Sequence, residues 1–314
     1  MLVRLRSGRG VRDYGILISF LVLFAVLSLS TSTFLTEQNM ANLLDQNAIF
    51  GILACAETLC IVSGVFDLSV SASLALSAIV AVSVGQADGS IAGFVAGTAT
   101  GGLLGLVNGL VVTYGKVNSF IATLATSIIF RGLALVLTGG DIVTTNAGGF
   151  GVFGQNSGIL GVTQASWLFL AVVLVTGVLL ASTTYGRALY AVGGNLEAAR
   201  LSGLRTGFVR TSVFALSGVL AGMAGLVEAS RTSSAQASTG TGWELTAIAA
   251  TIVGGTSILG GDGAIWRAVV GVFILALIGN GMNLASINST YQQGVQGLLI
   301  LFAVLADQWM RRRQ

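Results

Sequence analysis

Ten apolar runs, each long enough to cross a lipid bilayer as a helix, divide this chain of 314 residues. A spanning helix needs about 17 to 25 mostly apolar residues, and charged, Gly-rich or Asn-rich stretches bound each run. Only 9% of the residues are charged, whereas soluble domains usually have about 25%. The sequence therefore predicts an all-α polytopic membrane protein and excludes an ordinary soluble enzyme. The predicted spans are 14–30, 47–64, 67–85, 90–112, 118–138, 165–182, 208–227, 244–260, 264–285 and 291–309.

The basic residues orient these spans, because cytoplasmic segments of membrane proteins carry an excess of Lys and Arg. With residues 1–13 in the cytoplasm, thirteen of the 15 basic residues fall on the inner side. Of the other two, Arg231 lies in an outer loop and Arg131 lies within a span. We therefore expect one transmembrane domain over 1–314, with both termini cytoplasmic. The expected periplasmic loop is 139–164, and the expected cytoplasmic coupling loop is 183–207.

Four short strings recur in the same order in the two halves of the chain. FDLS at 66–69 resembles WELT at 243–246, and the other pairs are 88–91 with 262–265, 108–109 with 280–281, and 117–119 with 287–289. Matched strings lie five spans apart, and since five is odd, the two copies cross the membrane in opposite directions. The sequence thus predicts an inverted repeat of spans 2–5 and 7–10. Transporters built this way place the substrate at the repeat interface and alternate its access.

Glycines recur at every fourth position along the fourth predicted span. Such a stripe lets two helix backbones approach closely. We expect it to serve close static packing rather than movement. The stripe consists of Gly97, Gly101, Gly105 and Gly109, and the seventh span repeats the spacing with Gly218 and Gly222.

Nucleotide and metal motifs are absent in the form their chemistry requires. A GxGxxG occurs at 149–154, but it lies in a loop without a βαβ pattern. Gly115-Lys116 resembles the end of a P-loop, but Val117 stands where Ser or Thr is needed. The chain has no Pro and no His. The absence of His excludes His-ligated metals and imidazole proton relays. We expect no catalytic residue, metal, cofactor of its own or nucleic-acid partner.

The loop 183–207 predicts a two-turn cytoplasmic helix. Asn195 can cap its start, Glu197 suits its positive first turn, and Arg200 lies nearer its negative end. Gly203 fits the C-terminal cap. Such a short helix cannot bury its own apolar residues, so we expect it to present them to a cytoplasmic partner. These apolar residues are Ala198, Ala199 and Leu201.

Glu197-Ala198-Ala199 followed by Gly203 resembles the EAA coupling loop of ATP-binding cassette importer permeases. The whole chain resembles the bacterial monosaccharide permease family, the membrane subunits of ribose, xylose and related importers. The matching stretches are GVFDLSVSASLALSA, NSFIATLATSIIFRGLALVLTGG, YGRALYAVGGNLEAARLSG, ELTAIAATIVGGTSILGGDGAIW and QQGVQGLLILFAVLAD.

The resemblance implies a multi-pass subunit of the bacterial inner membrane without an ATPase of its own. Its implied partners are two cytoplasmic ATP-binding cassette subunits, a periplasmic solute-binding protein and a second permease, in a homodimer or a heterodimer. ATP would be bound by the partner subunits. The resemblance also implies that the helix around 197–203 lies in a groove of the ATPase and drives alternating access for a monosaccharide.

Polar residues inside the predicted spans are the candidates for the substrate pathway. Charges at the bilayer centre cost roughly 2.5 to 3.5 kcal/mol on insertion scales, so such groups face protein or water. Sugars need carboxylates and amides that bind hydroxyl groups. The candidates are Glu57, Asp67, Asn108, Arg131, Glu244, Asn280, Asn283, Gln292 and Gln296.

Three other readings remain open at this point. A permease of related build for branched-chain amino acids or nucleosides would have the same overall features. An ion-coupled secondary transporter would also use an inverted repeat, although it would not need a capped cytoplasmic helix. A channel would normally show a repeated filter or a ring of like charges, and the sequence has neither.

Overall fold

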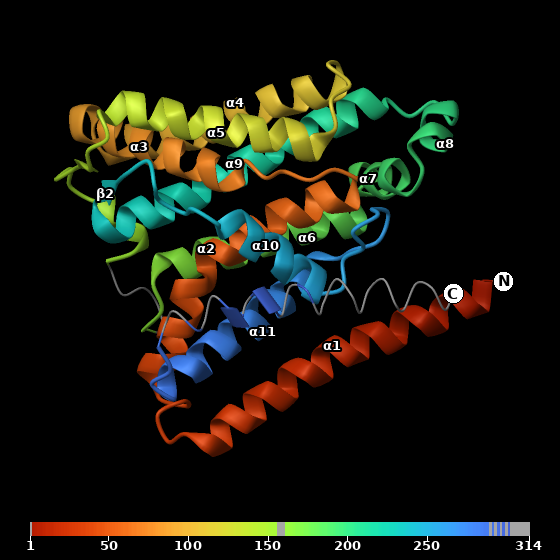
Figure 1. Ribbon diagram of the computed structural model, residues 1–314, viewed down its shortest axis with the longest axis horizontal. Helices are drawn as coiled ribbons and strands as arrows, with labels where there is room; N and C mark the ends of the chain where they lie inside the picture. Colours follow the sequence, from red (N-terminus) through yellow and green to blue (C-terminus); the bar gives the residue numbers. More distant parts are fainter. Residues whose placement is uncertain are drawn as a thin grey trace.

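The computed structural model describes residues 2–155 and 161–288, with six single positions between 291 and 301. Within this part the chain is almost entirely helical, with one two-stranded antiparallel sheet (Figure 1). The elements are α1 (Leu2–Ser30), α2 (Glu37–Val62), α3 (Val70–Asp88), α4 (Ser90–Thr113), α5 (Ser119–Thr138), β1 (Val143–Thr144), η1 (Phe150–Phe153), α6 (Gln164–Ser182), α7 (Thr184–Gly194), α8 (Leu196–Leu201), α9 (Thr206–Thr232), β2 (Ser234–Ala235), α10 (Trp243–Val253) and α11 (Ile265–Leu284).

Among the described residues, seven helices are long and apolar enough to cross a membrane, namely α2, α3, α4, α5, α6, α9 and α11. The apolar part of α1, Tyr14–Ser30, coincides with the first predicted span. A polytopic all-α membrane protein is therefore confirmed. Most of the predicted span 291–309 lies outside the described residues.

Two predicted spans differ clearly from the observed helices, and the span predicted at 67–85 is moved along the chain, since α3 covers Val70–Asp88 and leaves Asp67 in the irregular segment before it. The span predicted at 47–64 begins earlier, because Thr36 caps the helix and accepts a hydrogen bond from the Asn39 N–H. The span predicted at 244–260 is an 11-residue helix, α10. It ends at Gly254 and Gly255, where a Cβ on Gly254 would lie 2.3 Å from the carbonyl oxygen of Arg267 in α11. This close approach and the positive φ of Gly255 stop the helix despite the apolar residues that follow.

Two irregular segments lead into α3 and α10. Residues 63–69 return from the end of α2 toward the middle of the bundle, where α3 begins (Figure 1). Residues 236–242 enter after β2, and α10 then begins near the middle of the bundle (Figure 1). A hydrogen bond between Ser71 in α3 and Glu244 in α10 joins the starts of the two helices. The N-terminal ends of α3 and α10 therefore meet in the interior.

The glycine stripe of α4 packs directly against α9. A Cβ on Gly101 would lie 2.2 Å from the Gly218 carbonyl oxygen, and one on Gly105 would lie 2.1 Å from that of Phe214. On the α9 side, a Cβ on Gly218 would lie 2.1 Å from the Gly101 carbonyl oxygen. The predicted close packing is confirmed, and it brings two backbones together with no room for side chains between them.

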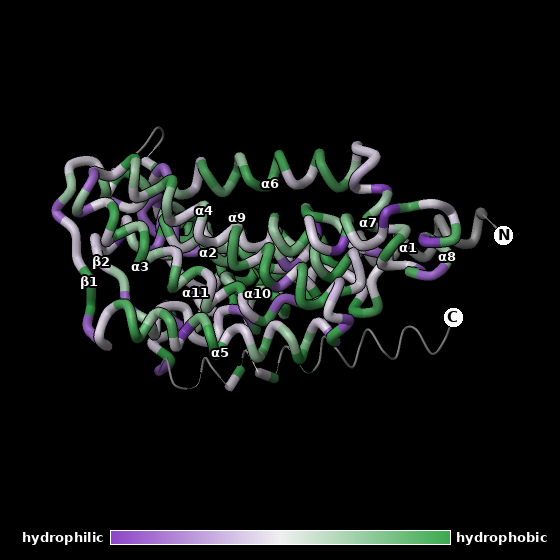
Figure 2. Tube along the Cα trace, turned by 90° about the horizontal axis from the view of Figure 1, so that it is seen from above, coloured by the Kyte–Doolittle hydropathy of each residue, from purple (hydrophilic) through white to green (hydrophobic). Residues whose placement is uncertain are grey.

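The two ends of the bundle differ in structure. The start of α1, α7 and α8 lie at one end, and the sheet of β1 and β2 lies at the other (Figure 1). In the sheet, Val143 pairs with Ala235 and Thr144 with Ser234, which ties the 139–164 loop to the end of α9. Hydrophilic residues gather near α8 and near β1, and α6 between them is mostly hydrophobic (Figure 2).

Candidate functional site

A cluster of polar side chains lies where the starts of α3 and α10 meet, and we call it the central polar cluster. Asp67 is almost completely buried, and its Oδ1 accepts hydrogen bonds from the N–H and the hydroxyl of Ser69 at 3.1 and 2.6 Å. Its Oδ2 accepts from the Ser217 hydroxyl of α9 at 2.9 Å. Asn108 of α4 donates to the Ser69 hydroxyl at 2.6 Å. The cluster comprises Asp67, Ser69, Ser71, Asn108, Arg131, Ser217 and Glu244.

Glu244 joins this cluster through α3 and α5. Its Oε2 accepts a 2.5 Å hydrogen bond from the Ser71 hydroxyl, and Arg131 of α5 donates to the same hydroxyl at 3.3 Å. The cluster thus contains two carboxylates, one amide and one guanidinium, drawn from both halves of the chain. Polar groups inside a membrane protein typically mark substrate or ion pathways.

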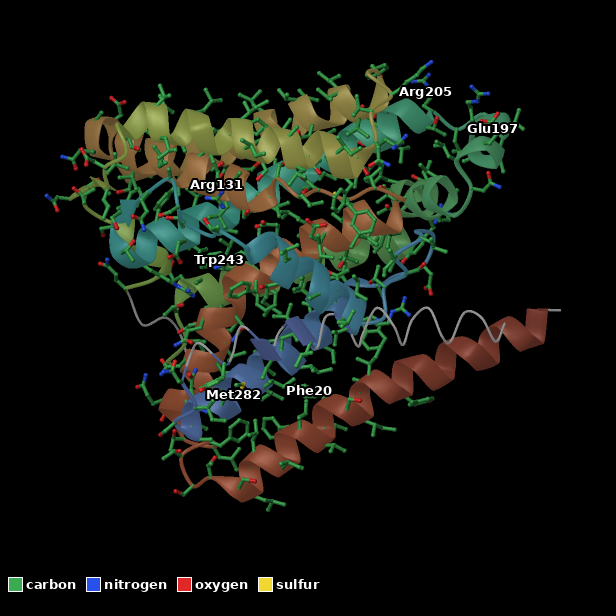
Figure 3. The ribbon with its side chains drawn as sticks, in the orientation of Figure 1. Phe20, Arg131, Glu197, Arg205, Trp243 and Met282 are labelled. Carbon is green, nitrogen blue, oxygen red and sulfur yellow. The ribbon has the colours of Figure 1, made fainter. Side chains whose placement is uncertain are left out.

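Helix α5 satisfies the backbone of both irregular segments. The Ser119 and Thr123 hydroxyls accept hydrogen bonds from the N–H groups of Phe66 and Leu68 at 3.2 and 3.0 Å. Arg131 donates to the carbonyl oxygens of Ala237 and Thr239 at 2.6 and 3.1 Å (Figure 3 labels Arg131). Non-helical backbone at membrane depth is tolerated only where protein or water satisfies it. These contacts explain how both segments enter the interior.

Unpartnered acceptors lie beside the cluster. Glu57 of α2 is completely buried, and neither of its carboxyl oxygens has a hydrogen-bond partner among the described residues. The N–H of Asp67 lies near this carboxyl without reaching hydrogen-bonding geometry. The Oδ1 of Asn108 likewise has no partner within the described part of the chain. Buried acceptors without donors are costly in a protein, so these atoms suit a ligand that donates hydroxyl hydrogen bonds.

The structure therefore groups some predicted pathway residues and separates others. It brings Asp67, Asn108 and Glu244 into one cluster, with Glu57 beside it. Asn280 instead exchanges hydrogen bonds with Asn39 of α2 at 2.8 and 3.2 Å, away from the cluster. Asn283 is exposed near the end of α11. Gln292 and Gln296 lie outside the described residues.

The prediction from sequence omitted the hydroxyl groups of the cluster. Ser69, Ser71 and Ser217 carry most of its hydrogen bonds. In the sequence they look like ordinary small residues of packed helices. The alternating serines of 69–73 directly after Asp67 are the signal that could have identified two of them.

The predicted cytoplasmic helix is present as α8, a six-residue helix. The Asn195 side chain accepts a hydrogen bond from the Ala198 N–H at 2.9 Å, and Gly203 has the positive φ of a C-terminal cap. Glu197 and Arg200 form an exposed ion pair at 2.7 Å. Figure 3 shows Glu197, a residue of α8, at the end of the molecule. The local structure of this segment follows the prediction.

One residue of this helix is placed differently from the prediction. Ala199 is 4% exposed and packs in the main hydrophobic core cluster, so it is not presented to the cytoplasm. Helix α8 packs against both α7 and α9, and the loop sequence alone does not encode this packing. Leu201, in contrast, is 79% exposed, and Ala198 is also exposed.

Helix α7 fastens this exposed helix to the core. A Cβ on Gly193 would lie 1.9 Å from the carbonyl oxygen of Val62, the last residue of α2. The Gly261 N–H donates to the same oxygen at 2.9 Å, and the Tyr190 hydroxyl donates to the Gly263 carbonyl at 2.7 Å. The end of α7 therefore touches both the start of segment 63–69 and the loop between α10 and α11.

Comparison with known proteins identifies relatives along nearly the whole chain. The family model described as "Branched-chain amino acid transport system / permease component" matches residues 39–304. The chain is 42% identical over 296 residues to the ribose import permease protein RbsC of Escherichia coli K12, covering 93% of this chain and 92% of that protein. RbsC of Bacillus subtilis 168 is 42% identical over 301 residues, which are 95% of this chain and 93% of that protein.

The L-arabinose transport system permease protein AraH of Escherichia coli K12 is 39% identical over 306 residues, covering 97% of this chain and 93% of that protein. No solved structure matched the chain. Permease components carry no ATPase of their own, which agrees with the role expected for this sequence. The multi-pass fold and these relatives place the chain in the bacterial cytoplasmic membrane. It therefore belongs to the branched-chain amino acid transport system/permease component family, the permease subunits of ATP-binding cassette importers.

Proposed function

We propose that this chain is the permease subunit through which an ATP-driven importer moves a monosaccharide into the cytoplasm. The observation that carries this proposal is the near full-length identity of about 40% to permeases named for ribose and L-arabinose. The family model is named for branched-chain amino acids. The named relatives favour a sugar over that alternative and over a nucleoside.

The central polar cluster is the proposed sugar pathway. A sugar presents many hydroxyl groups, and its hydroxyls can donate to carboxylate and amide oxygens. The unpartnered oxygens of Glu57 and Asn108 provide acceptors of this kind, beside the carboxylates of Asp67 and Glu244. We place Asn280, Asn283, Gln292 and Gln296 along the remainder of the pathway.

Ten spans in two inverted repeats, with both termini cytoplasmic, form the proposed architecture. Three correspondences in the packing support it. Helix α3 packs on α4 and α9 as α10 packs on α11 and α2, and α4 packs on α9 as α11 packs on α2. In each half, an irregular segment leads to a helix that begins in the interior with an acidic residue near its start. Sites between half-helices at a repeat interface are typical of transporters.

Helix α8 is the proposed docking point for a cytoplasmic ATPase subunit, through Asn195, Glu197, Ala198, Arg200 and Gly203. Leu201 and Ala198 provide its exposed apolar contact, and Ala199 fixes the helix to the core. A displacement of α8 and α7 would be transmitted to Val62 and to the loop 254–263, which α7 contacts. Val62 precedes the segment that leads to α3, and the loop follows α10, so both helices at the cluster would be affected. This route links ATP binding in the partner to alternating access in this chain.

The complete importer would contain two ATPase subunits, a periplasmic solute-binding protein and a second permease copy. ATP stays with the ATPase subunits, and this chain needs no cofactor. An ion-coupled transporter is the second candidate, since an inverted repeat also serves that mechanism. The capped helix α8 favours the ATP-driven alternative.

Co-purification from the membranes of the source organism tests the coupling role. The tagged wild-type chain should retain an ATP-binding cassette subunit, detected by its ATPase activity and by mass spectrometry. Leu201→Asp should lose it, whereas Leu35→Asp, an exposed residue in the loop between α1 and α2 at the other end, should retain it. Equal copurification of the ATPase with both variants would contradict this role of α8. Absence of the ATPase from all three preparations, the wild type included, would also contradict it.

A further inference from the structure

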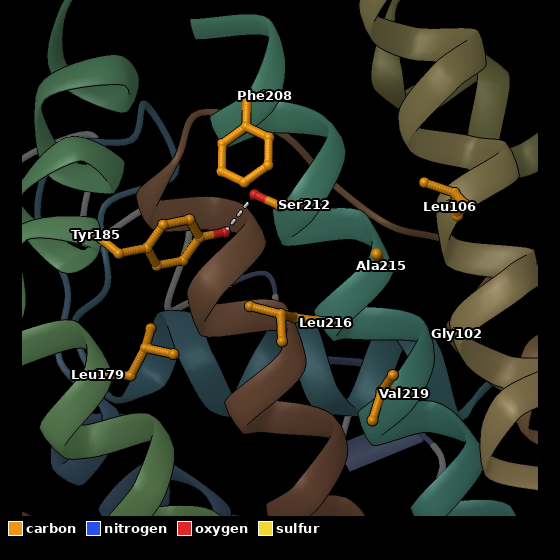
Figure 4. A pocket seen from close by; sticks show the side chains of 9 residues that line it. All are labelled: Gly102, Leu106, Leu179, Tyr185, Phe208, Ser212, Ala215, Leu216 and Val219. Atoms are coloured by element: carbon orange, nitrogen blue, oxygen red, sulfur yellow. Dashed lines mark hydrogen bonds between the residues drawn. The ribbon is translucent and has the colours of Figure 1, made fainter. Parts of the chain in front are cut away.

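An apolar groove runs along α9 between α4 and α6, outside the central polar cluster (Figure 4). Its volume is about 550 Å³, and it is open on one side. The lining residues are Gly102, Leu106, Leu179, Tyr185, Phe208, Ser212, Ala215, Leu216 and Val219.

The two hydroxyl groups in this lining are already satisfied by each other. The Tyr185 and Ser212 oxygens are 2.7 Å apart and share a hydrogen bond (Figure 4). The groove therefore presents almost pure hydrocarbon and no polar atom that would orient a polar ligand. An occupant of matching chemistry is an alkyl chain.

The length of the groove matches one leaflet of a bilayer. It extends along α9 from Phe208 to Val219, which is about 16 Å at 1.5 Å per residue. The hydrocarbon core of a bilayer is about 30 Å thick, so each leaflet is about half of this. Phe208 lies at the end of α9 that follows α8, and in the proposed orientation this end faces the cytoplasm. The groove thus spans the cytoplasmic leaflet alone.

Cationic residues stand at the mouth of the groove. Arg205 is exposed one turn before Phe208, and Figure 3 shows it at the end of α9. Lys116 follows α4, whose Tyr114 hydroxyl lies close to Gly207. Within residues 14–155 and 161–288, neither Arg205 nor Lys116 has an acidic partner within 4 Å. Basic residues at this depth attract anionic lipid headgroups.

We infer that the groove binds an anionic phospholipid of the cytoplasmic leaflet, with one acyl chain along α9 and the phosphate near Arg205 and Lys116. The matching length, the apolar lining and the basic mouth all suit such a lipid. A second copy of this chain would need a broad complementary surface, whereas this groove is one helix long and bounded by α4 and α6.

Native mass spectrometry of the purified chain tests this inference. The protein is equilibrated in micelles that contain equal amounts of phosphatidylglycerol and phosphatidylethanolamine. The wild type should retain one phosphatidylglycerol, and Ala215→Phe should lower the retained fraction at least fivefold by filling the groove. Leu106→Phe fills the same groove from α4 and should lower the retained fraction as well. It provides the test if Ala215→Phe does not fold. Val136→Phe, on the exposed face of α5, is the matched control and should retain the lipid.

Arg205→Gln separates the headgroup from the chain. It should retain a lipid but lose the preference for phosphatidylglycerol, whereas Arg187→Gln on α7 should keep that preference. The inference is overturned if the wild type retains no lipid, if both groove variants retain it undiminished, or if Arg205→Gln leaves the preference unchanged. A lipid-free dimer that the groove variants dissociate would assign the groove to a second copy instead.

Discussion

Replacing Gly105 by Ala should destabilise this protein far more than an alanine usually does in a helix. The added Cβ would lie 2.1 Å from the Phe214 carbonyl oxygen and 3.0 Å from the Gly218 Cα. Both atoms belong to the backbone of α9, so neither can rotate away. The helices α4 and α9 must separate along their whole contact.

The size of the effect follows from the cost of overpacking. Inserting a methyl group into a well-packed contact costs typically about 1–3 kcal/mol. Replacing Gly by Ala at an exposed helix position raises the free energy of unfolding by about 0.5–1 kcal/mol. Gly132 of α5 provides this comparison, since a Cβ there would meet nothing within 4 Å. The two variants should therefore differ by roughly 1.5–4 kcal/mol, the sum of these two ranges.

Thermal unfolding of the purified chain in one detergent measures this difference. At about 2–4 °C per kcal/mol for domains of somewhat smaller size, Gly105→Ala should melt several degrees below the wild type. Gly101→Ala should behave similarly, because its Cβ would lie 2.2 Å from the Gly218 carbonyl oxygen. Gly132→Ala should melt at or slightly above the wild-type temperature. Equal melting temperatures for all three variants would refute the direct backbone contact of α4 and α9.

Three further predictions concern single side chains. Asn195→Ala removes the cap of α8 and should cost about 1 kcal/mol, seen as faster amide hydrogen exchange at Ala198, with Asn195→Asp retaining protection. Arg131→Gln should leave the carbonyls of segment 236–242 without their donor, so limited proteolysis within this segment should increase, whereas Arg187→Gln should not change it. Burial raises the pKa of Tyr185 above its ordinary value of 10.0, so the fold favours the neutral phenol; its stabilising contribution is present below pH 10 and lost at higher pH. Stability should fall more steeply above pH 10 in the wild type than in Tyr185→Phe, and equal slopes in urea titrations would refute this.

The elements of this fold were largely predictable from local patterns. Apolar length marked nearly every membrane helix, and the spacing of Gly97 to Gly109 indicated a close helix contact, although not that α9 is the partner. The cap of α8 was also predictable, since Asn195 and Gly203 act within a few residues of themselves. Each of these signals concerns neighbours in sequence.

The structure differs from the prediction where contacts between residues far apart in the sequence determine the local structure. Helix α10 stops at Gly254 because α11 lies against it, although the apolar residues continue. Ala199 is buried because α8 packs against α7 and α9. Asn280 pairs with Asn39 from another helix, so its position in a repeated string did not reveal its partner. In the candidate site, the carboxylates could be recognised in the sequence. The serines that bond them could not, because their role depends on how α3 and α10 meet in the fold.

The arrangement also suggests why the cluster lies where it does. Asp67 and Glu244 stand near the starts of two helices that enter from opposite ends of the bundle. Helix N-termini carry partial positive charge, which favours nearby carboxylates and other anionic or electron-rich groups. A site of this kind can be exposed to either side by moving one half of the chain against the other.

Uptake into proteoliposomes tests the central proposal most directly. The vesicles contain this chain with its copurified ATPase, ATP is enclosed on the ATPase side, and the solute-binding protein with radiolabelled ribose or L-arabinose is supplied on the other. We predict sugar accumulation that requires ATP and is lost in both Leu201→Asp and Asp67→Ala, with Leu35→Asp as the active control. Accumulation of sugar by this chain alone, driven by an ion gradient without any ATPase, would contradict the account.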